Sequence, residues 1–369
     1  MGESKPHSLP GLTGLRGLAA LWVFAYHIFK SFAGDGAAVL ASDAIPFLRE
    51  GWRGVDLFFI LSGFVIAHVH LGDFAHPARG RVKAYLLRRF WRVYPLNAFW
   101  HGAIVLLFLA APFVLTVQAR FQPVSVTPEA FLASIFLVQS WIPGYSSAWN
   151  WPSWSLSAEI AAYLLFPLLA VSANRLRHPA QCWAVAGFAI VMLGLLLATL
   201  GVLGTNAVEY YTAVLRAVFC FTAGVALCRA VSLAPLPAEI ANRLALAGLA
   251  LAIAGCLGSP WNYLWVPASA LFIAAASSKG SVAASFLSAR PIYRLGEVSF
   301  SLYLSHWPVI LILRTVLVER GPDAGIFFAA AAIVATLIAT MAITYASWRF
   351  IEAPMHRYGR RMSDAKTRP

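Results

Sequence analysis

Long apolar stretches alternate with short polar and basic segments along almost the whole chain. A membrane-spanning helix needs about 20 mainly apolar residues, and the pattern therefore predicts an all-α polytopic membrane protein with about ten transmembrane helices. Two of the stretches, 244–258 and 261–277, are shorter than the others. The predicted spans cover residues 11–33, 51–70, 95–117, 150–173, 182–203, 209–228, 244–258, 261–277, 298–318 and 326–348.

A further apolar stretch, 128–142, is bracketed by Pro128 and Pro143 and is too short for a full crossing. We expect a short re-entrant or interfacial helix there. With that assignment, 21 of the 28 Lys and Arg residues fall on one side of the membrane. The positive-inside rule then predicts that both termini are cytoplasmic. If 128–142 crossed instead, Arg175, Arg177 and the basic tail would lie outside.

The composition agrees with this pattern: 60% of residues are hydrophobic and 12% are charged, whereas an ordinary soluble domain has about 25% charged residues. The net charge of +13 is explained by the basic loops, so nucleic acid is not an expected partner. The four cysteines lie in apolar runs without CxxC spacing. Neither a disulfide framework nor a metal site is therefore predicted.

Ionisable residues inside spans are costly and mark pathways or sites. Arg16 and His27 share one stripe of the first span, since eleven residues of helix rotate back to within about 20° of the starting face. Asp56 and Glu159 begin two inward-running spans at a depth similar to that of His27. A carboxylate beside His27 would orient it for acid–base catalysis. The alternatives are a topology anchor for Arg16, a hydrogen-bonded core histidine and a helix cap at Asp56.

Other polar residues fit the same picture. Arg89 and Arg92 lie three apart on one helix face at a cytoplasmic end, and guanidinium groups suit phosphate, although topology anchoring alone explains such charges. Ser155 lies one turn before Glu159. Tyr303 and His306 share one side of a polar span and are expected to line a cavity, with hydrogen bonding between helices as the alternative.

These residues fall in motifs that resemble the acyltransferase-3 family of integral-membrane acyltransferases. The resemblance covers the chain from about Leu9 to Met355. Phe300 and Ser305 depart from the family pattern, where many relatives have tyrosine and tryptophan. The motifs, in family order, are LTGLRGLAALWVFAYHI, GVDLFFILSGF, RRFWRVYPL, WSLSAE, LGEVSFSLYLSHWP and RFIEAPM.

The resemblance implies a ten-helix transmembrane domain, 1–355, followed by a short basic cytoplasmic tail, 356–369. It implies transfer of an acyl group, usually acetyl, from acyl-coenzyme A to a hydroxyl of a carbohydrate or glycosylated acceptor such as exopolysaccharide, O-antigen or glycolipid. Acyl-coenzyme A is then a donor substrate, and no tightly bound cofactor is expected. A stand-alone enzyme in a bacterial inner membrane is the expected setting. The family pattern carries over to Arg16, His27, Arg89, Arg92 and Glu352, and less directly to Asp56, Ser155, Glu159 and Tyr303.

Together these arguments predict a site in three parts. Trp154 is included as a platform for a sugar ring, although tryptophans in membrane proteins also form the interfacial belt. The alternative function is a proton-coupled exporter of a polar solute, which is disfavoured because no inverted repeat or pair of broken helices is evident. The predicted residues are His27, Asp56 and Glu159 for catalysis, Arg16, Arg89 and Arg92 for the coenzyme, and Ser155, Trp154, Tyr303 and His306 for the acceptor.

Overall fold

The computed structural model describes residues 9–32, 45–75, 79–114, 125–206, 210–317 and 326–365. All regular elements within these ranges are helices, and β pairing among them is limited to one bridge between Ser125 and Ala148. The all-α prediction is therefore confirmed. The long helices are α1 (Pro10–Phe32), α3 (Gly54–His70), α4 (Arg79–Ala110), α7 (Trp154–Arg175), α8 (Pro179–Thr199), α9 (Tyr210–Leu233), α10 (Ala238–Gly255), α13 (Arg290–Leu317) and α14 (Ile326–Ser347).

Nine helical segments among the described residues are long and apolar enough to cross a membrane, and they correspond to nine of the ten predicted spans. The remaining predicted span contains η7 (Trp261–Leu264) and α11 (Trp265–Ser277). Thirteen residues of α11 rise only about 20 Å, which is less than the roughly 30 Å hydrocarbon core. A multi-pass membrane protein is thus supported, and the count of ten crossings stays a prediction.

The central helices pack closely because glycines remove side chains from their contacts. A Cβ at Gly63 of α3 would lie 2.0 Å from the carbonyl oxygen of Phe221 in α9, and one at Gly224 would lie 1.9 Å from that of Ile60. A Cβ at Gly296 of α13 would similarly meet the carbonyl oxygen of Thr13 in α1 at 1.9 Å. Small residues at such crossings let van der Waals contact hold helices together in lipid. Peripheral helices, such as α8 and α10, are far less buried.

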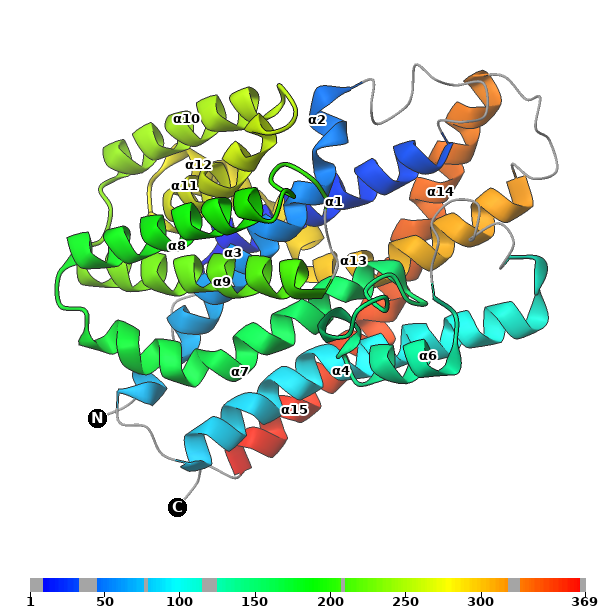
Figure 1. Ribbon diagram of the computed structural model, residues 1–369, viewed down its shortest axis with the longest axis horizontal. Helices are drawn as coiled ribbons and strands as arrows, with labels where there is room; N and C mark the ends of the chain where they lie inside the picture. Colours follow the sequence, from blue (N-terminus) through cyan, green and yellow to red (C-terminus); the bar gives the residue numbers. More distant parts are fainter. Residues whose placement is uncertain are drawn as a thin grey trace.

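Residues 128–142 do not form a membrane-crossing helix. They contain α6 (Pro128–Ile135) and the 3-10 turn η5 (Gln139–Trp141). The eight residues of α6 rise only about 12 Å, and Thr127 caps the helix by accepting a hydrogen bond from the Ala130 amide at 3.2 Å. The chain then passes through η6 (Trp151–Ser153) into α7. The end of α4 and the start of α7 lie on the same side of the molecule (Figure 1).

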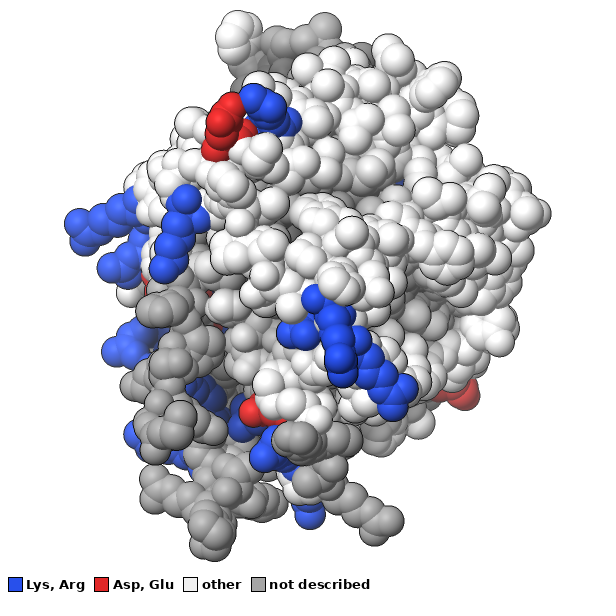
Figure 2. Space-filling model, turned by 90° about the vertical axis from the view of Figure 1, so that its left-hand side faces the viewer, with Lys and Arg blue, Asp and Glu red and all other residues white. Residues whose placement is uncertain are grey.

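The other end of the bundle is basic. Figure 2 views this end, which is the left-hand end of Figure 1, and shows Lys and Arg side chains gathered on it with few acidic residues. The start of α4 and the end of α15 (Ala353–Ala365) lie there (Figure 1). α15 follows the π-helical turn η8 (Trp348–Glu352) and packs along α4, where Trp91 and Tyr358 meet edge to face. The predicted boundary after Met355 falls within this helix and remains a prediction. The other short helices are α2 (Pro46–Arg49), η3 (Gly51–Arg53), η4 (Gly72–Phe74) and α12 (Val282–Leu287).

Candidate active site

A cavity of about 140 Å³ lies between α1, α3, α4, α7 and α13. Its apolar wall comes mainly from α3, including Phe58 and Phe59. Six of the ten residues predicted for the site line this one cavity, although they are spread over nearly 290 residues of sequence. They are Arg16 of α1, Arg89 and Arg92 of α4, Ser155 and Glu159 of α7, and Tyr303 of α13.

Three arginines give one wall of the cavity its positive charge. Arg16 Nη2 donates a hydrogen bond to the Gly296 carbonyl oxygen at 2.8 Å. The buried Nε atoms of Arg16 and Arg89 have no hydrogen-bond partner among the described residues. Buried polar atoms in proteins are nearly always hydrogen-bonded. At the edge of a cavity, such donors are available to an anionic or hydrogen-bond-accepting ligand.

Glu352 fixes the third arginine. Its carboxylate forms an ion pair with Arg92 and accepts hydrogen bonds from the Ser301 amide at 3.1 Å and the Ser301 hydroxyl at 2.6 Å. The Arg92 guanidinium also lies over the Phe300 ring, 5.0 Å from its centroid. Glu352 belongs to η8, and π-helical turns are often found at functional sites. Only the family resemblance pointed to this residue, and its role in holding Arg92 was not foreseen.

Polar side chains of α7 and α13 also meet at the cavity. The hydroxyls of Ser155 and Tyr303 are 2.8 Å apart, and the Pro152 carbonyl oxygen lies 3.2 and 3.0 Å from them respectively. The two hydroxyl protons therefore serve three contacts. Glu159 forms side-chain hydrogen bonds with Ser62 of α3 and Tyr163 of its own helix. Ser62 was not predicted, because a single serine in an apolar span gives no distinct signal. These contacts join three helices around the cavity.

His27 lies beside the cavity rather than on its wall. Its Nδ1 atom is 3.2 Å from Nε2 of His306, and the ring contacts Trp151 and Trp307 edge to face. The ring of His306 is in turn 5.8 Å from that of Tyr303, centroid to centroid. Tyr303 therefore connects the cavity to the two histidines.

The predicted pairing of Asp56 with His27 is wrong. Asp56 Oδ2 accepts from Arg53 Nη1 at 3.1 Å, and Oδ1 accepts from Arg216 Nε at 2.9 Å. Helix rise predicts how deep a residue lies but not which neighbour its side chain faces, and Asp56 faces α9 instead of α1. Arg216 was missed, although an arginine inside an apolar span is itself a signal. The Trp154 ring lies near that arginine, 5.6 Å from its guanidinium carbon, and is not on the cavity wall.

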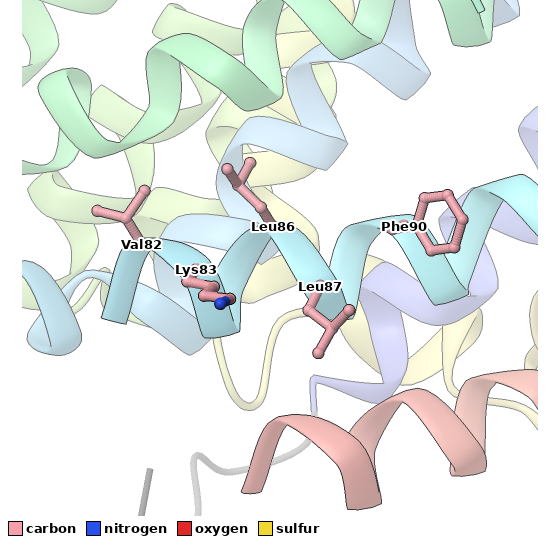
Figure 3. Close-up of a pocket in the computed structure, with 5 residues that line it drawn as sticks. All are labelled: Val82, Lys83, Leu86, Leu87 and Phe90. Atoms are coloured by element: carbon pink, nitrogen blue, oxygen red, sulfur yellow. The ribbon is translucent and has the colours of Figure 1, made fainter. Parts of the chain in front are cut away.

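A larger surface hollow of about 540 Å³ runs along the outside of α4 (Figure 3). It shares no residue with the charged cavity, and Lys83 is its one charged side chain. The described residues contain no group of three or more His, Cys, Asp or Glu side chains placed to hold a metal ion.

Residues 9–345 match the family Acyl_transf_3, described as an acyltransferase domain. Acyltransferase MdmB of Streptomyces mycarofaciens is 34% identical over 191 residues, which are 50% of this chain and 45% of that protein. O-acetyltransferase OatA of Staphylococcus aureus (strain NCTC 8325 / PS 47) is 24% identical over 96% of this chain and 58% of its own length. Peptidoglycan O-acetyltransferase OatA of Listeria monocytogenes is 27% identical over 95% and 56% respectively.

The chain thus spans about half the length of the curated relatives it matches. No solved structure shows a significant match to it. The family match covers nearly all the described helices, including every residue that lines the charged cavity. The chain belongs to the acyltransferase-3 family.

Proposed function

We propose that this protein is a membrane O-acyltransferase that moves an acetyl group from acetyl-coenzyme A to a hydroxyl of a carbohydrate or glycosylated acceptor. The observation that carries the proposal is the cavity in which Arg16, Arg89 and Arg92 surround a space bordered by Ser155, Glu159 and Tyr303. The names of the two OatA relatives support O-acetyl transfer, and one of them specifies peptidoglycan. Peptidoglycan is one example of the carbohydrate acceptors proposed here, which also include other polysaccharides and glycolipids.

Coenzyme A suits the arginine wall because its phosphates carry several negative charges. A guanidinium group offers donors in a rigid fork that matches phosphate oxygens. Arg16 and Arg89 keep Nε donors unsatisfied by the described residues, whereas Glu352 holds Arg92 in place. The arginines would bind the nucleotide end of the donor, and its pantetheine arm would extend through the cavity towards Tyr303. The donor binds and leaves in each cycle.

His27 is the proposed general base. It takes the proton of the acceptor hydroxyl while the hydroxyl oxygen attacks the thioester carbonyl carbon. A C–O bond forms, the C–S bond breaks, and the departing thiolate receives the proton from His27. Direct transfer accounts for the reaction without an acyl-histidine intermediate. Ser155 and Tyr303 bond to each other on the cavity wall, and the Tyr303 ring lies beside that of His306, so the two side chains would orient the reacting groups.

The alternative function, a proton-coupled exporter, is not favoured by the contacts of its supposed relay residues. A proton relay through Arg16, His27, Asp56 and Glu159 would need neighbouring side chains that exchange protons. Asp56 is instead held by two arginines, and the hydrogen-bond partners of Glu159 are Ser62 and Tyr163. His27 pairs with another histidine.

The decisive experiment measures acetyl-coenzyme A turnover by the purified protein in lipid nanodiscs. Loss of a general base costs about 10²–10⁴-fold in rate, so His27→Ala should retain less than about 1% of wild-type turnover with an unchanged Kd for acetyl-coenzyme A. The matched control is His101→Ala. His101 is also a buried histidine within a helix, and its Nδ1 atom lies 2.9 Å from the carbonyl oxygen of Asn97, one turn earlier. Turnover by His27→Ala near the control's level would overturn the assignment of the base.

The proposed orientation places the basic end and both termini in the cytoplasm, where acyl-coenzyme A is made, and the protein in a bacterial inner membrane. In a cysteine-free background, we expect Glu129→Cys to react with an impermeant thiol reagent added outside intact spheroplasts. Lys279→Cys should react only after the membrane is opened. Both positions are exposed, so accessibility does not bias the comparison. The reverse pattern of labelling would overturn the orientation.

A further inference from the structure

We infer that His306 is a positioning residue that holds the proton of His27 on Nδ1 and so leaves Nε2 of His27 as the basic atom. The inference rests on the proposed function for its catalytic consequence, but the proton position is a separate structural claim. The sequence pattern placed His306 among the acceptor-binding residues. Its contacts point instead to His27, 279 residues away in sequence.

The first step concerns His306 itself. Its Nδ1 atom lies 3.1 Å from the carbonyl oxygen of Leu302, one turn earlier in α13. A carbonyl oxygen can only accept a hydrogen bond, so Nδ1 must carry the proton. A neutral imidazole has one N–H and one lone pair. The lone pair of His306 therefore lies on Nε2.

The second step transfers this constraint to His27. Nε2 of His306 is 3.2 Å from Nδ1 of His27, and a lone pair at that distance requires a donor opposite it. Nδ1 of His27 must then be protonated, which leaves the lone pair on Nε2. Two N–H groups facing each other would break the contact, so a second proton on His306 is disfavoured.

The surroundings explain why a histidine fills this role. In serine proteases a buried carboxylate holds the catalytic histidine in the correct tautomer. Here the rings around the pair are those of Phe24, Tyr26, Trp151, Tyr303 and Trp307. No carboxylate bonds to either histidine among the described residues. A neutral acceptor avoids the cost of burying a charge in this apolar setting. Lys30, near the end of α1, acts electrostatically on His27.

The kinetic test compares His306→Leu with His306→Gln in the full-length protein. Leucine removes the acceptor, whereas the glutamine side-chain oxygen can take the place of Nε2. A wrong tautomer lowers kcat by about 10⁴-fold in the protease case, and we expect a fall of at least about 100-fold for His306→Leu, with KM for acetyl-coenzyme A within about twofold. His306→Gln should recover kcat to within about tenfold of the wild type. A His306→Leu enzyme with kcat within twofold of wild type, or a glutamine variant as poor as the leucine variant, would overturn the inference.

The structural test does not depend on turnover. Nitrogen-15 spectra of histidine-labelled protein report which ring nitrogen carries the proton, with His27→Gln used to assign the signals. We expect His27 to be protonated at Nδ1 in the wild type and in His306→Gln, and to show a mixture in His306→Leu. A wild-type His27 protonated at Nε2 would contradict the inference. Absence of acetyl-coenzyme A turnover would contradict the proposed function but would not affect the result on the position of the His27 proton.

Discussion

Two groups of arginines lie inside the helix bundle, and they differ in what their guanidinium groups face. The closed cluster consists of Arg53, Asp56 and Arg216, each no more than 2% exposed. The Trp52 ring covers both guanidinium groups, at 3.9 Å from that of Arg53 and 5.3 Å from that of Arg216. Arg53 also donates to the Asn262 side-chain oxygen at 3.0 Å. The cluster ties the start of α3 to α9 and to η7.

The arginines of the cavity lack such enclosure. Arg92 has a carboxylate partner in Glu352, but Arg16 binds a backbone carbonyl, and Arg89 borders the same empty space. A charge inside a span is therefore not by itself a sign of a binding site. The informative difference is whether its hydrogen-bonding groups face protein or a cavity.

The largest effect on stability should come from breaking the closed cluster. Asp56→Asn keeps the side-chain shape but leaves two buried arginines without a counter-charge. Removing one partner of a buried ion pair costs about 3–5 kcal/mol. We expect a loss of this size in the free energy of unfolding, measured by titration with SDS in mixed micelles.

The matched control is Glu159→Gln, a substitution of the same kind at a residue on the cavity wall. It should change stability by about 1 kcal/mol or less, the size of one ordinary hydrogen bond. An Asp56→Asn protein that is as stable as the wild type but has lost acyl transfer would reverse the comparison. Asp56 would then belong to catalysis, as the sequence predicted.

The next largest effect concerns the donor. Arg89→Ala removes a cationic donor that borders the cavity, and a hydrogen bond to a charged group contributes about 1.5–3 kcal/mol. The Kd for acetyl-coenzyme A, measured by calorimetry, should rise by about 10- to 150-fold. Lys83→Ala serves as the control because Lys83 lies on the same helix but faces the surface hollow (Figure 3). Equal affinities for the two variants would show that Arg89 acts only as a topology anchor.

The sequence was informative about which residues face inward. Lipid gives every unpaired polar group a high cost, so Arg16, Glu159 and Tyr303 stood out within apolar runs, and all three line the cavity. The same cost keeps most polar residues out of the spans, so the long apolar runs predicted where the long helices lie. The depth of a residue along its helix could also be predicted from the sequence, because the rise per residue is fixed.

The partners of these residues could not be predicted in the same way. Two helices that run antiparallel at the same depth can face each other or turn away, and only packing decides between these arrangements. Close contacts at Gly63 and Gly224 bring α3 against α9, which places Asp56 beside Arg216. Close contact at Gly296 brings α13 against α1, which places His306 beside His27. Single glycines in apolar runs do not reveal their partners.

The smallest effect is expected at Asp73 of η4, a carboxylate whose side chain is partly exposed although its partner His70 is buried. His70 Nδ1 donates to Asp73 Oδ2 at 2.8 Å, Arg88 lies 3.8 Å from the same oxygen, and Asp73 is 45% exposed. A carboxylate that stays in contact with water gains only about 0–1 kcal/mol from its charged partners. Asp73→Asn should therefore lower the free energy of unfolding by less than about 1 kcal/mol. A loss as large as that of Asp56→Asn would contradict the idea that burial of a charged pair determines how much its disruption destabilises the fold.

The stabilising effect of Asp73 should depend on pH, in a direction that its pKa determines. The hydrogen bond from His70 lowers the pKa of Asp73 below its ordinary value, so the folded state favours the ionised carboxylate. Such a group stabilises the fold above the pKa it has in the unfolded chain, and the contribution is lost as the pH falls through the lower, folded pKa. The difference in Tm between wild type and Asp73→Asn should thus be complete at pH 7 and shrink below about pH 4. Glu239→Gln, at the exposed pair with Arg243, is the control and should show almost no difference, because enclosure there is weaker still.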